Sequence, residues 1–273
     1  MTSLHPKLVG ADRAQLRATF TSADPFPHIV LDDAIAPAVL DELVATFPDD
    51  AWEGWDRFTD SYQAGKRYCQ DIAAMPAAHA RVINELTQPA FLDLLRDITG
   101  IDGLIPDPYL EGGGLHSSGA GGVLTPHTDF HLYTRLGLHR QLNLLLYLNQ
   151  DWKPGDGGRL GLWRKGEEEP RVRVAPELGR VVIFRTADDS VHGFADPVAE
   201  GRERHSIALY YYTAAESEAY AGDTTTYWQQ HRATSVVARI RLRIYQALLL
   251  TARGFAMLAH RANPNLTRRR PHR

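Results

Sequence analysis

The sequence predicts an α+β protein in which antiparallel β-structure dominates and helices lie at both ends of the chain. Residues 1–103 carry apolar side chains mostly at helical spacing. Residues 104–213 change to short apolar runs separated by glycine and proline, which is typical of an antiparallel sandwich or jelly roll. Residues 224–273 return to helical spacing. No helical crossover separates the central runs, which argues against a parallel α/β sheet.

Three helices are predicted in the N-terminal part, over residues 37–47, 77–86 and 89–98. A proline stands at the start of the first, where its missing N–H removes no helical hydrogen bond. Gly100 follows the third and predicts its C-terminal end. The apolar side chains that recur near a 3.6-residue period in the first helix are Val39, Leu40, Leu43 and Phe47.

Residues 52–71 show no clear period and are rich in aromatic and charged side chains. Long irregular segments of this kind are often lids over a site, and an ordinary surface loop is the alternative. A lid over residues 52–68 would place Trp55 at the entrance of a central pocket.

Short strands are predicted over residues 141–149, 159–163, 180–185 and 205–213. The first alternates, so that four leucines occupy one face and a largely polar set occupies the other. The leucine face is Leu142, Leu144, Leu146 and Leu148, and the opposite face is Gln141, Asn143, Leu145, Tyr147 and Asn149.

The composition is that of a folded globular protein, with 44% hydrophobic and 23% charged residues. We expect one domain over residues 1–223, helical to residue 103 and jelly-roll from 104 to 213, followed by a basic helical extension over residues 224–273. Cys69 is the one cysteine, so no internal disulfide forms. The N-terminal stretch lacks the apolar core of a signal peptide, and the expectation is a cytoplasmic protein.

The net charge of -3 conceals a division along the chain. Residues 224–273 hold ten arginines and no acidic residue, whereas residues 1–223 carry a formal charge of -13. An apolar stripe over residues 224–260 is too short to span a bilayer and predicts a contact with a membrane surface, a second subunit or the protein's own sheet. Three consecutive arginines near the end are a poor nucleic-acid signature, and we expect no such partner. The stripe is Val237, Ile240, Ile244, Leu248, Phe255 and Leu258.

His127, Thr128 and Asp129 form the most informative motif of the chain. In an extended strand alternate side chains share a face, so the histidine and the aspartate would project together. Two histidines and one carboxylate leave coordination positions open on one side of a ferrous ion, as in non-haem iron oxygenases. His192 is the third candidate, because it follows the apolar strand over residues 180–185 on what reads as a loop.

A candidate anion site follows twelve residues after His192. Arg204 and Ser206 share a face of the strand that begins there. An arginine on a rigid strand binds a carboxylate through two parallel hydrogen bonds, and the serine hydroxyl adds a third. Buried in a barrel, this arginine would be costly without an anionic partner. Arg202 is the alternative, although it lies outside the Arg-x-Ser register.

From residue 112 to residue 213 the chain resembles the Fe(II)- and 2-oxoglutarate-dependent dioxygenases, most closely their prolyl-4-hydroxylase-like branch. The run Tyr-Leu-Asn-Gln-Asp-Trp, which begins at Tyr147, is nearly identical to a segment of family members. Four features occur in the family's order. They are His127-x-Asp129; Arg140 followed by residues 142–149 and Trp152; Gly157 and Gly158 before a strand; and His192 followed by Arg204-x-Ser206.

The resemblance implies a double-stranded β-helix, the cupin-like jelly roll, with flanking helices. It implies that His127, Asp129 and His192 bind Fe(II). The implied reaction consumes dioxygen, releases succinate and carbon dioxide from 2-oxoglutarate, and hydroxylates an unactivated C–H bond. Ascorbate enters this expectation as a supporting reductant.

The resemblance also implies a cosubstrate site. Arg204 would bind the distal carboxylate of 2-oxoglutarate, with Tyr147 and Ser206 as supporting donors. Many prolyl hydroxylases place a tyrosine shortly before the first iron ligand, where this chain has His116 and Ser117. That departure weakens the transfer of their substrate, and His116 would serve either the cosubstrate site or the structure.

The substrate expected from the sequence is a polar small molecule, glycan or peptide. Iron halogenases carry a small residue where this chain has Asp129, so hydroxylation is favoured over halogenation. Arg140, His131 and Tyr133 would line the entrance together with Trp55. The alternative function is a non-catalytic cupin-like module that binds a metal or ligand, and such a module needs neither the complete triad nor the Arg-x-Ser strand.

Overall fold

The structure is a computed structural model that describes residues 3–58, 63–214 and 227–228 and seven further positions, namely 240, 244, 247, 248, 251, 255 and 258. The chain divides into two compact units, Met1–Gln229 and Gln230–Arg273. The short strand over residues 227–228 belongs to the first unit, although it lies beyond the predicted boundary at residue 223.

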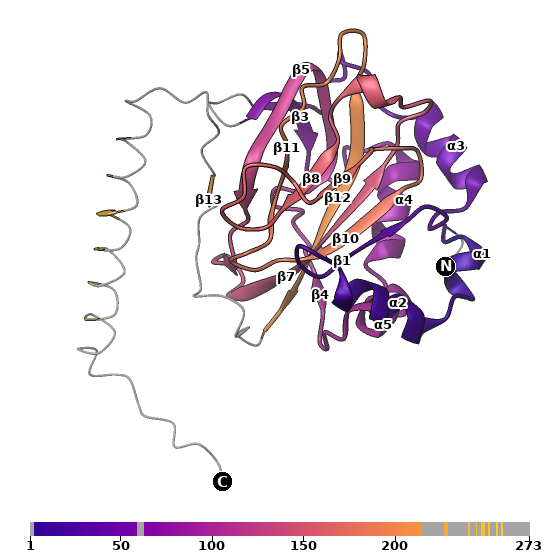
Figure 1. Ribbon diagram of the computed structural model, residues 1–273. Coiled ribbons are helices and arrows are strands. Elements are labelled where there is room, and N and C mark those ends of the chain that lie inside the picture. Colours follow the sequence, from indigo (N-terminus) through magenta and orange to yellow (C-terminus); the bar gives the residue numbers. More distant parts are fainter. Residues whose placement is uncertain are drawn as a thin grey trace. The chain divides into compact units, whose positions relative to one another are not determined.

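The N-terminal helices of the first unit lie against one side of its sheet (Figure 1). The helices predicted over residues 37–47, 77–86 and 89–98 are confirmed as α3, α4 and α5. Gly100 ends α5 in the left-handed conformation, with a φ of 76°, and its N–H donates to the carbonyl of Arg96. The five α-helices of residues 3–100 are α1 (Pro6–Val9), α2 (Arg13–Ser22), α3 (Pro37–Ala45), α4 (Ala77–Leu86) and α5 (Pro89–Thr99).

The sheet is antiparallel throughout its described pairs. Its main path runs β1-β10-β7-β12-β5-β11-β8-β9, and the remaining strands pair at its sides. One 3-10 turn, Pro154–Asp156, precedes β8. The strands are β1 (His28–Leu31), β2 (Asp56–Phe58), β3 (Gln63–Cys69), β4 (Ile105–Pro106), β5 (Gly114–Thr128), β6 (Leu132–Tyr133), β7 (Leu138–Tyr147), β8 (Leu160–Trp163), β9 (Val172–Val174), β10 (Val181–Arg185), β11 (Val191–Phe194), β12 (Arg204–Thr213) and β13 (Tyr227–Trp228).

Strand β5 joins the two halves of the sheet. Its first residues pair with β12, where Gly114 lies opposite Ala208, and its last residues pair with β11, where His127 lies opposite His192. The sheet therefore curls into the double-stranded β-helix that the sequence predicts, with helices flanking it (Figure 1).

Strand β7 shows how the sheet separates its two faces. Its leucine face, Leu142, Leu144 and Leu146, is fully buried against the helices. Asn143 and Leu145 point to the interior of the roll and line a pocket there. Burying a large apolar side chain contributes roughly 1.5–3 kcal/mol, so the leucine face anchors this strand to the helical layer. The helical side of that contact includes Phe91, Leu94, Leu95 and Ile98 of α5, which recur at helical spacing.

The prediction of an irregular segment over residues 52–71 was wrong. Strands β2 and β3 form a hairpin there, and β3 also pairs with β5. The sequence hides this strand because neither of its faces is consistently apolar. Lys66 faces the pocket, whereas Arg67 is buried in an ion-pair network. A strand without an apolar face gives no alternating signal.

Five members of the predicted C-terminal stripe are described, and all of them are helical. Ile240, Ile244, Leu248, Phe255 and Leu258 are between 53% and 73% exposed. The sixth member, at position 237, lies outside the described residues. None of the helices in the described part of the chain has the length and apolar character needed to cross a membrane. The contact expected over residues 224–260 therefore stays a prediction.

Candidate functional site

Two neighbouring strands bring His127, Asp129 and His192 together. His127 on β5 lies directly opposite His192 on β11, and Asp129 follows the end of β5. All three are buried, and a ligand atom from each lies within 4.8 Å of the others. The loop expected around His192 is instead strand β11, so hydrogen bonds of the sheet fix this histidine.

Backbone carbonyls orient both imidazoles. Nδ1 of His127 lies 2.9 Å from the carbonyl oxygen of Thr125, and Nδ1 of His192 lies 3.0 Å from that of Ser190. Because a carbonyl only accepts, each Nδ1 carries a proton, which leaves Nε2 as the nitrogen that can bind a metal. The two Nε2 atoms each lie 3.4 Å from a carboxylate oxygen of Asp129. Burial lowers the pKa of His192 to about 4, so this ring is neutral near pH 7.

A buried pair behind Asp129 fixes its carboxylate. Nη2 of Arg140 lies 3.0 Å from Oδ2 of Asp129, and the Asn143 amide donates to the same oxygen at 2.7 Å. Nε of Arg140 donates to Oδ1 of Asn143 at 2.9 Å, which closes the triangle. Burial alone would raise the pKa of Asp129, but Arg140 and the two histidines outweigh it and hold the pKa well below its usual range. The carboxylate is therefore ionised in the buried site.

The donor set fits a divalent iron ion. Two imidazole nitrogens and one carboxylate are the ligands of non-haem Fe(II), and here they converge from one wall of a pocket. Carbonyls behind both histidines and the amide and guanidinium behind the aspartate supply the outer contacts that orient metal ligands.

The pocket that contains the triad extends to Arg204 and Ser206. Nε of Arg204 donates to the carbonyl of Gly158 at 2.7 Å, and Nη2 donates to the Tyr147 hydroxyl at 3.0 Å. Burial lowers the pKa of Arg204, yet a guanidinium stays charged in proteins. No carboxylate of the described residues forms an ion pair with it. A buried arginine in this state fits an anionic ligand.

Two consecutive glycines pack closely behind this arginine. A Cβ on Gly158 would lie 3.0 Å from Cδ of Arg204, and one on Gly157 would lie 1.8 Å from the carbonyl oxygen of Pro197. The φ angle is 69° at Gly157 and 60° at Gly158, and residues with a side chain rarely adopt such positive values. The glycine pair that the resemblance singled out therefore shapes the wall behind Arg204.

The remaining residues named for the cosubstrate lie close to Arg204. Ser206 is buried and lines the pocket two residues further along β12. Tyr147 is fully buried behind Arg204, outside the pocket lining, and accepts its hydrogen bond. His116 lines the pocket. Arg202 is placed differently, because its Nε lies 3.1 Å from Asp156 and its guanidinium covers the Trp152 ring.

Of the four residues expected at the substrate entrance, only Arg140 lines the pocket. His131 is buried, with Nδ1 3.4 Å from Oδ1 of Asp188. Tyr133 packs its ring 5.3 Å from that of Tyr212. Trp55 belongs to the main core and donates its indole N–H to the carbonyl of Asp49 at 2.7 Å. The structure places these three side chains outside the pocket lining because packing, which the sequence pattern does not encode, turns them into the protein.

Two residues of the site had no assigned role in the sequence. Asn143 links Arg140 to Asp129, and its signal was its place on the polar face of an otherwise apolar strand. Lys66 lines the pocket from β3, and it was hidden in the segment that resembles a loop.

Comparisons with known proteins agree with this geometry. Residues 113–212 match the sequence profile of the 2OG-Fe(II) oxygenase superfamily. No curated protein matches the chain. Among solved structures, a prolyl-4-hydroxylase from Pseudomonas putida is 21% identical, with a TM-score of 0.51 over 73% of this chain and 99% of that one.

Two further structures are similar in fold. A prolyl hydroxylase from Trichoplax adhaerens, solved with a peptide fragment of hypoxia inducible factor, is 16% identical, with a TM-score of 0.52 over 73% of this chain and 90% of its own. The non-heme alpha ketoglutarate dependent epimerase SnoN from nogalamycin biosynthesis is 15% identical, with a TM-score of 0.54 over 74% of this chain and 85% of its own. At such identities the structural likeness establishes the shared fold.

Proposed function

Because residues 113–212 belong to the 2OG-Fe(II) oxygenase superfamily, we propose that this 2-oxoglutarate-dependent iron dioxygenase hydroxylates an unactivated C–H bond of a polar substrate. The substrate is a small molecule, a glycan or a peptide. The observation that carries the proposal is one pocket that holds both the buried His127–Asp129–His192 triad and the buried guanidinium of Arg204, which forms no ion pair with a carboxylate of the described residues.

The chemistry of the bound groups is that of the superfamily. Fe(II) with 2-oxoglutarate and dioxygen supplies the oxidation, in which one oxygen atom goes to succinate as carbon dioxide leaves and the other goes to the substrate carbon. Ascorbate would keep the iron reduced between turnovers. Dioxygen and ascorbate belong to this proposal, together with hydroxylation itself.

The protein's own residues hold and orient the reactants. His127, His192 and Asp129 would bind the iron through two Nε2 atoms and one carboxylate, each already fixed by a backbone or side-chain contact. Arg204 would donate to the distal carboxylate of 2-oxoglutarate, and the Ser206 hydroxyl would donate beside it. The Tyr147 hydroxyl accepts from Arg204 and so keeps its own proton free to donate.

The walls of the pocket between its polar groups are apolar. Leu145, Leu160, Phe184 and Phe194 line it between the polar groups. Such a lining strengthens the electrostatic contacts to the cosubstrate and protects a reactive site from side reactions. A non-catalytic cupin-like module would need no buried arginine aligned with the metal ligands, so we propose no such role.

An anaerobic titration tests the proposal. The full-length protein is mixed with Fe(II) and then with 2-oxoglutarate, and a visible charge-transfer band is expected only when both are present. The Zn(II)-loaded protein serves as the control, because it offers the same ligands without the redox chemistry. Admitting air should then yield succinate from the iron sample alone. No band and no succinate would refute the assignment.

A further inference from the structure

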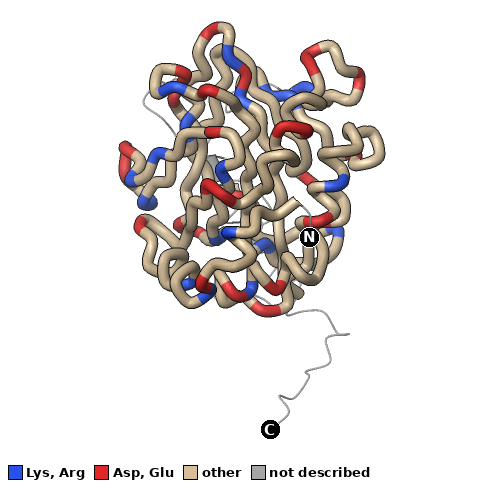
Figure 2. Tube along the Cα trace, turned by 90° about the vertical axis from the view of Figure 1, so that its right-hand side faces the viewer, with Lys and Arg blue, Asp and Glu red and all other residues tan. Residues whose placement is uncertain are grey.

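Three cationic side chains and one carboxylate face the pocket. Lys66, Arg140 and Arg204 are the cations, and Asp129 is the carboxylate, paired with Arg140. Under the proposed function, on which this inference rests, Fe(II) and 2-oxoglutarate enter with opposite charges of equal size. The loaded pocket therefore keeps an excess of positive charge. In contrast, basic and acidic positions are interspersed along the outside of the first unit (Figure 2).

Lys66 reaches the pocket from a different strand than the arginine assigned to 2-oxoglutarate. It lies opposite Ser118 from β3, and Arg204 lies opposite the same Ser118 from β12. Directly opposite residues of antiparallel strands share a face, so all three side chains face the interior of the roll. Two inter-strand spacings, roughly 10 Å, separate the backbones of Lys66 and Arg204. The pocket thus offers two cations far enough apart for two different anions.

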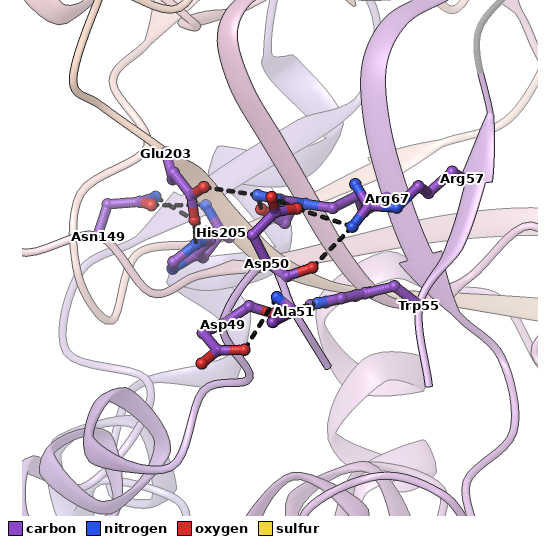
Figure 3. A network of polar contacts seen from close by, with 10 residues as sticks. Asp49, Asp50, Ala51, Trp55, Arg57, Arg67, Asn149, Glu203 and His205 are labelled. Atoms are coloured by element: carbon purple, nitrogen blue, oxygen red, sulfur yellow. Dashed lines mark hydrogen bonds and ion pairs between the residues drawn. The ribbon is translucent and has the colours of Figure 1, made fainter. Parts of the chain in front are cut away.

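The neighbouring residue, Arg67, is a cation with several protein partners. Arg67, on the opposite face of β3, forms ion pairs with Asp50 and Glu203 and donates to the Ser117 hydroxyl at 2.8 Å (Figure 3). Glu203 directly precedes Arg204, so this network ties β3 to the start of β12. The strand that carries Lys66 is therefore held in place by contacts in which Lys66 takes no part.

Among the described residues, Lys66 itself has no such partners. Its ammonium nitrogen lies 5.6 Å from the centroid of the Tyr68 ring, and no carboxylate in the described part of the chain forms an ion pair with it. Burial lowers its pKa to about 8 and the charge of Asp129 offsets this only in part, so the ammonium is largely protonated at neutral pH. The other three lysines, Lys7, Lys153 and Lys165, are exposed. A half-buried cation without a carboxylate partner is unfavourable unless an anionic ligand compensates its charge.

We propose that Lys66 forms an anion subsite, so that the primary substrate carries a carboxylate or phosphate group bound by the Lys66 ammonium while its reacting carbon faces the triad. This narrows the substrate from a polar molecule to an anionic one. The lysine selects by charge, since an ammonium is a compact donor without the planar fork of arginine.

Charge-selective labelling of the lysines tests the subsite without a known substrate. The full-length protein is treated with pyridoxal 5′-phosphate or with neutral pyridoxal, and in a second pair with 4-carboxybenzaldehyde or 4-formylbenzamide. Each aldehyde condenses with a lysine amine and loses water, and borohydride then reduces the imine to a stable secondary amine. Peptide mapping reads the label at all four lysines, with Lys165 as the internal control.

We expect an anionic reagent to label Lys66 at least about tenfold faster than its neutral partner, relative to Lys165, because the cationic pocket raises the local concentration of an anion beside the Lys66 amine by at least that factor. The pair that shows the larger ratio identifies phosphate or carboxylate as the preferred group. Inorganic phosphate should protect Lys66 and leave Lys165 unprotected. Equal labelling by charged and neutral reagents would overturn the proposal.

A further arm separates the subsite from the cosubstrate site. Zn(II) and 2-oxoglutarate are added at a concentration that saturates the cosubstrate site, and Lys66 should remain reactive toward the anionic aldehyde. Complete protection by 2-oxoglutarate would assign Lys66 to the cosubstrate and overturn the proposal. Since labelling requires no turnover, a charge preference at Lys66 without succinate formation would refute only the proposed function.

Discussion

Replacing Arg204 with methionine should remove most of the stabilisation that 2-oxoglutarate gives the protein. The guanidinium is buried, and its Nε and one Nη already donate to Gly158 and Tyr147. The remaining N–H groups would serve the distal carboxylate. Two charge-assisted hydrogen bonds contribute about 1.5 kcal/mol or more each, so their loss should weaken binding by about 100-fold.

The expected thermal shifts follow from this number. At a 2-oxoglutarate concentration of about 100 times the dissociation constant, binding stabilises the protein without the substitution by about 2.7 kcal/mol. For a domain of this size that raises Tm by roughly 5–10 °C. In the Arg204→Met variant the same concentration only matches the weakened dissociation constant. The stabilisation then falls to about 0.4 kcal/mol, or roughly 1 °C.

Differential scanning calorimetry with Mn(II) in place of iron measures both shifts without oxidation. Arg202→Met is the matched control, because Arg202 pairs with Asp156 outside the pocket and should keep the full shift. The reasoning is refuted by a full shift in Arg204→Met, and a lost shift in Arg202→Met would move the cosubstrate anchor to that residue.

Three further predictions concern the triad, the core and the tail. His127→Ala and Asp129→Ala should both abolish succinate formation. Circular dichroism melts should show the second losing about 3 kcal/mol more, since it removes the carboxylate that forms an ion pair with the buried Arg140; equal melting of the two would contradict this. Burial lowers the pKa of His79 from 6.5 to about 4, so the unfolded state binds more protons between these pH values and stability falls by about 3 kcal/mol as the pH drops from 6.5 to 4. Urea unfolding of His79→Leu should lack that part of the decline, and an unchanged pH profile would refute the assignment. A chain ending at residue 229 should keep turnover within about twofold. A chain ending at residue 223 loses strand β13, which pairs with β5 beside His127, and should bind iron more weakly in a competitive chelator titration. Equal iron affinity of the two chains would show that this strand does not support the site.

The residues named from the sequence for the metal lie around one pocket together with Arg204 and Ser206, whereas strand β3 among the first hundred residues escaped prediction. Short polar motifs at fixed spacing, such as His127-x-Asp129 and Arg204-x-Ser206, mark chemistry that few other arrangements serve. Strand β3 escaped prediction because a charged side chain stands on each of its faces. Lys66 faces the pocket, and Arg67 belongs to the ion-pair network on the other face. Periodicity detects a strand only where one face is apolar.

The substrate side of the pocket could not be predicted for a different reason. His131, Tyr133 and Trp55 are aromatic side chains near the metal motif or in the supposed lid, and their chemistry suits a binding surface as well as a core. Which of the two they join depends on tertiary packing, and the structure buries all three away from the pocket lining. Lys66 shows the converse, since a residue from an apparently loop-like segment faces the site.

The direct pairing of His127 and His192 across β5 and β11 couples metal retention to the opening of a single strand. A metal held by both histidines would link β5 to β11 through their side chains as well as through the backbone ladder, so separating these strands would also break the metal site. Every tenfold gain in metal affinity adds about 1.4 kcal/mol to the free energy of that local opening. Amide hydrogen exchange of residues 191–194 should therefore slow when metal binds, and its rate would report the occupancy of the centre in the absence of any substrate.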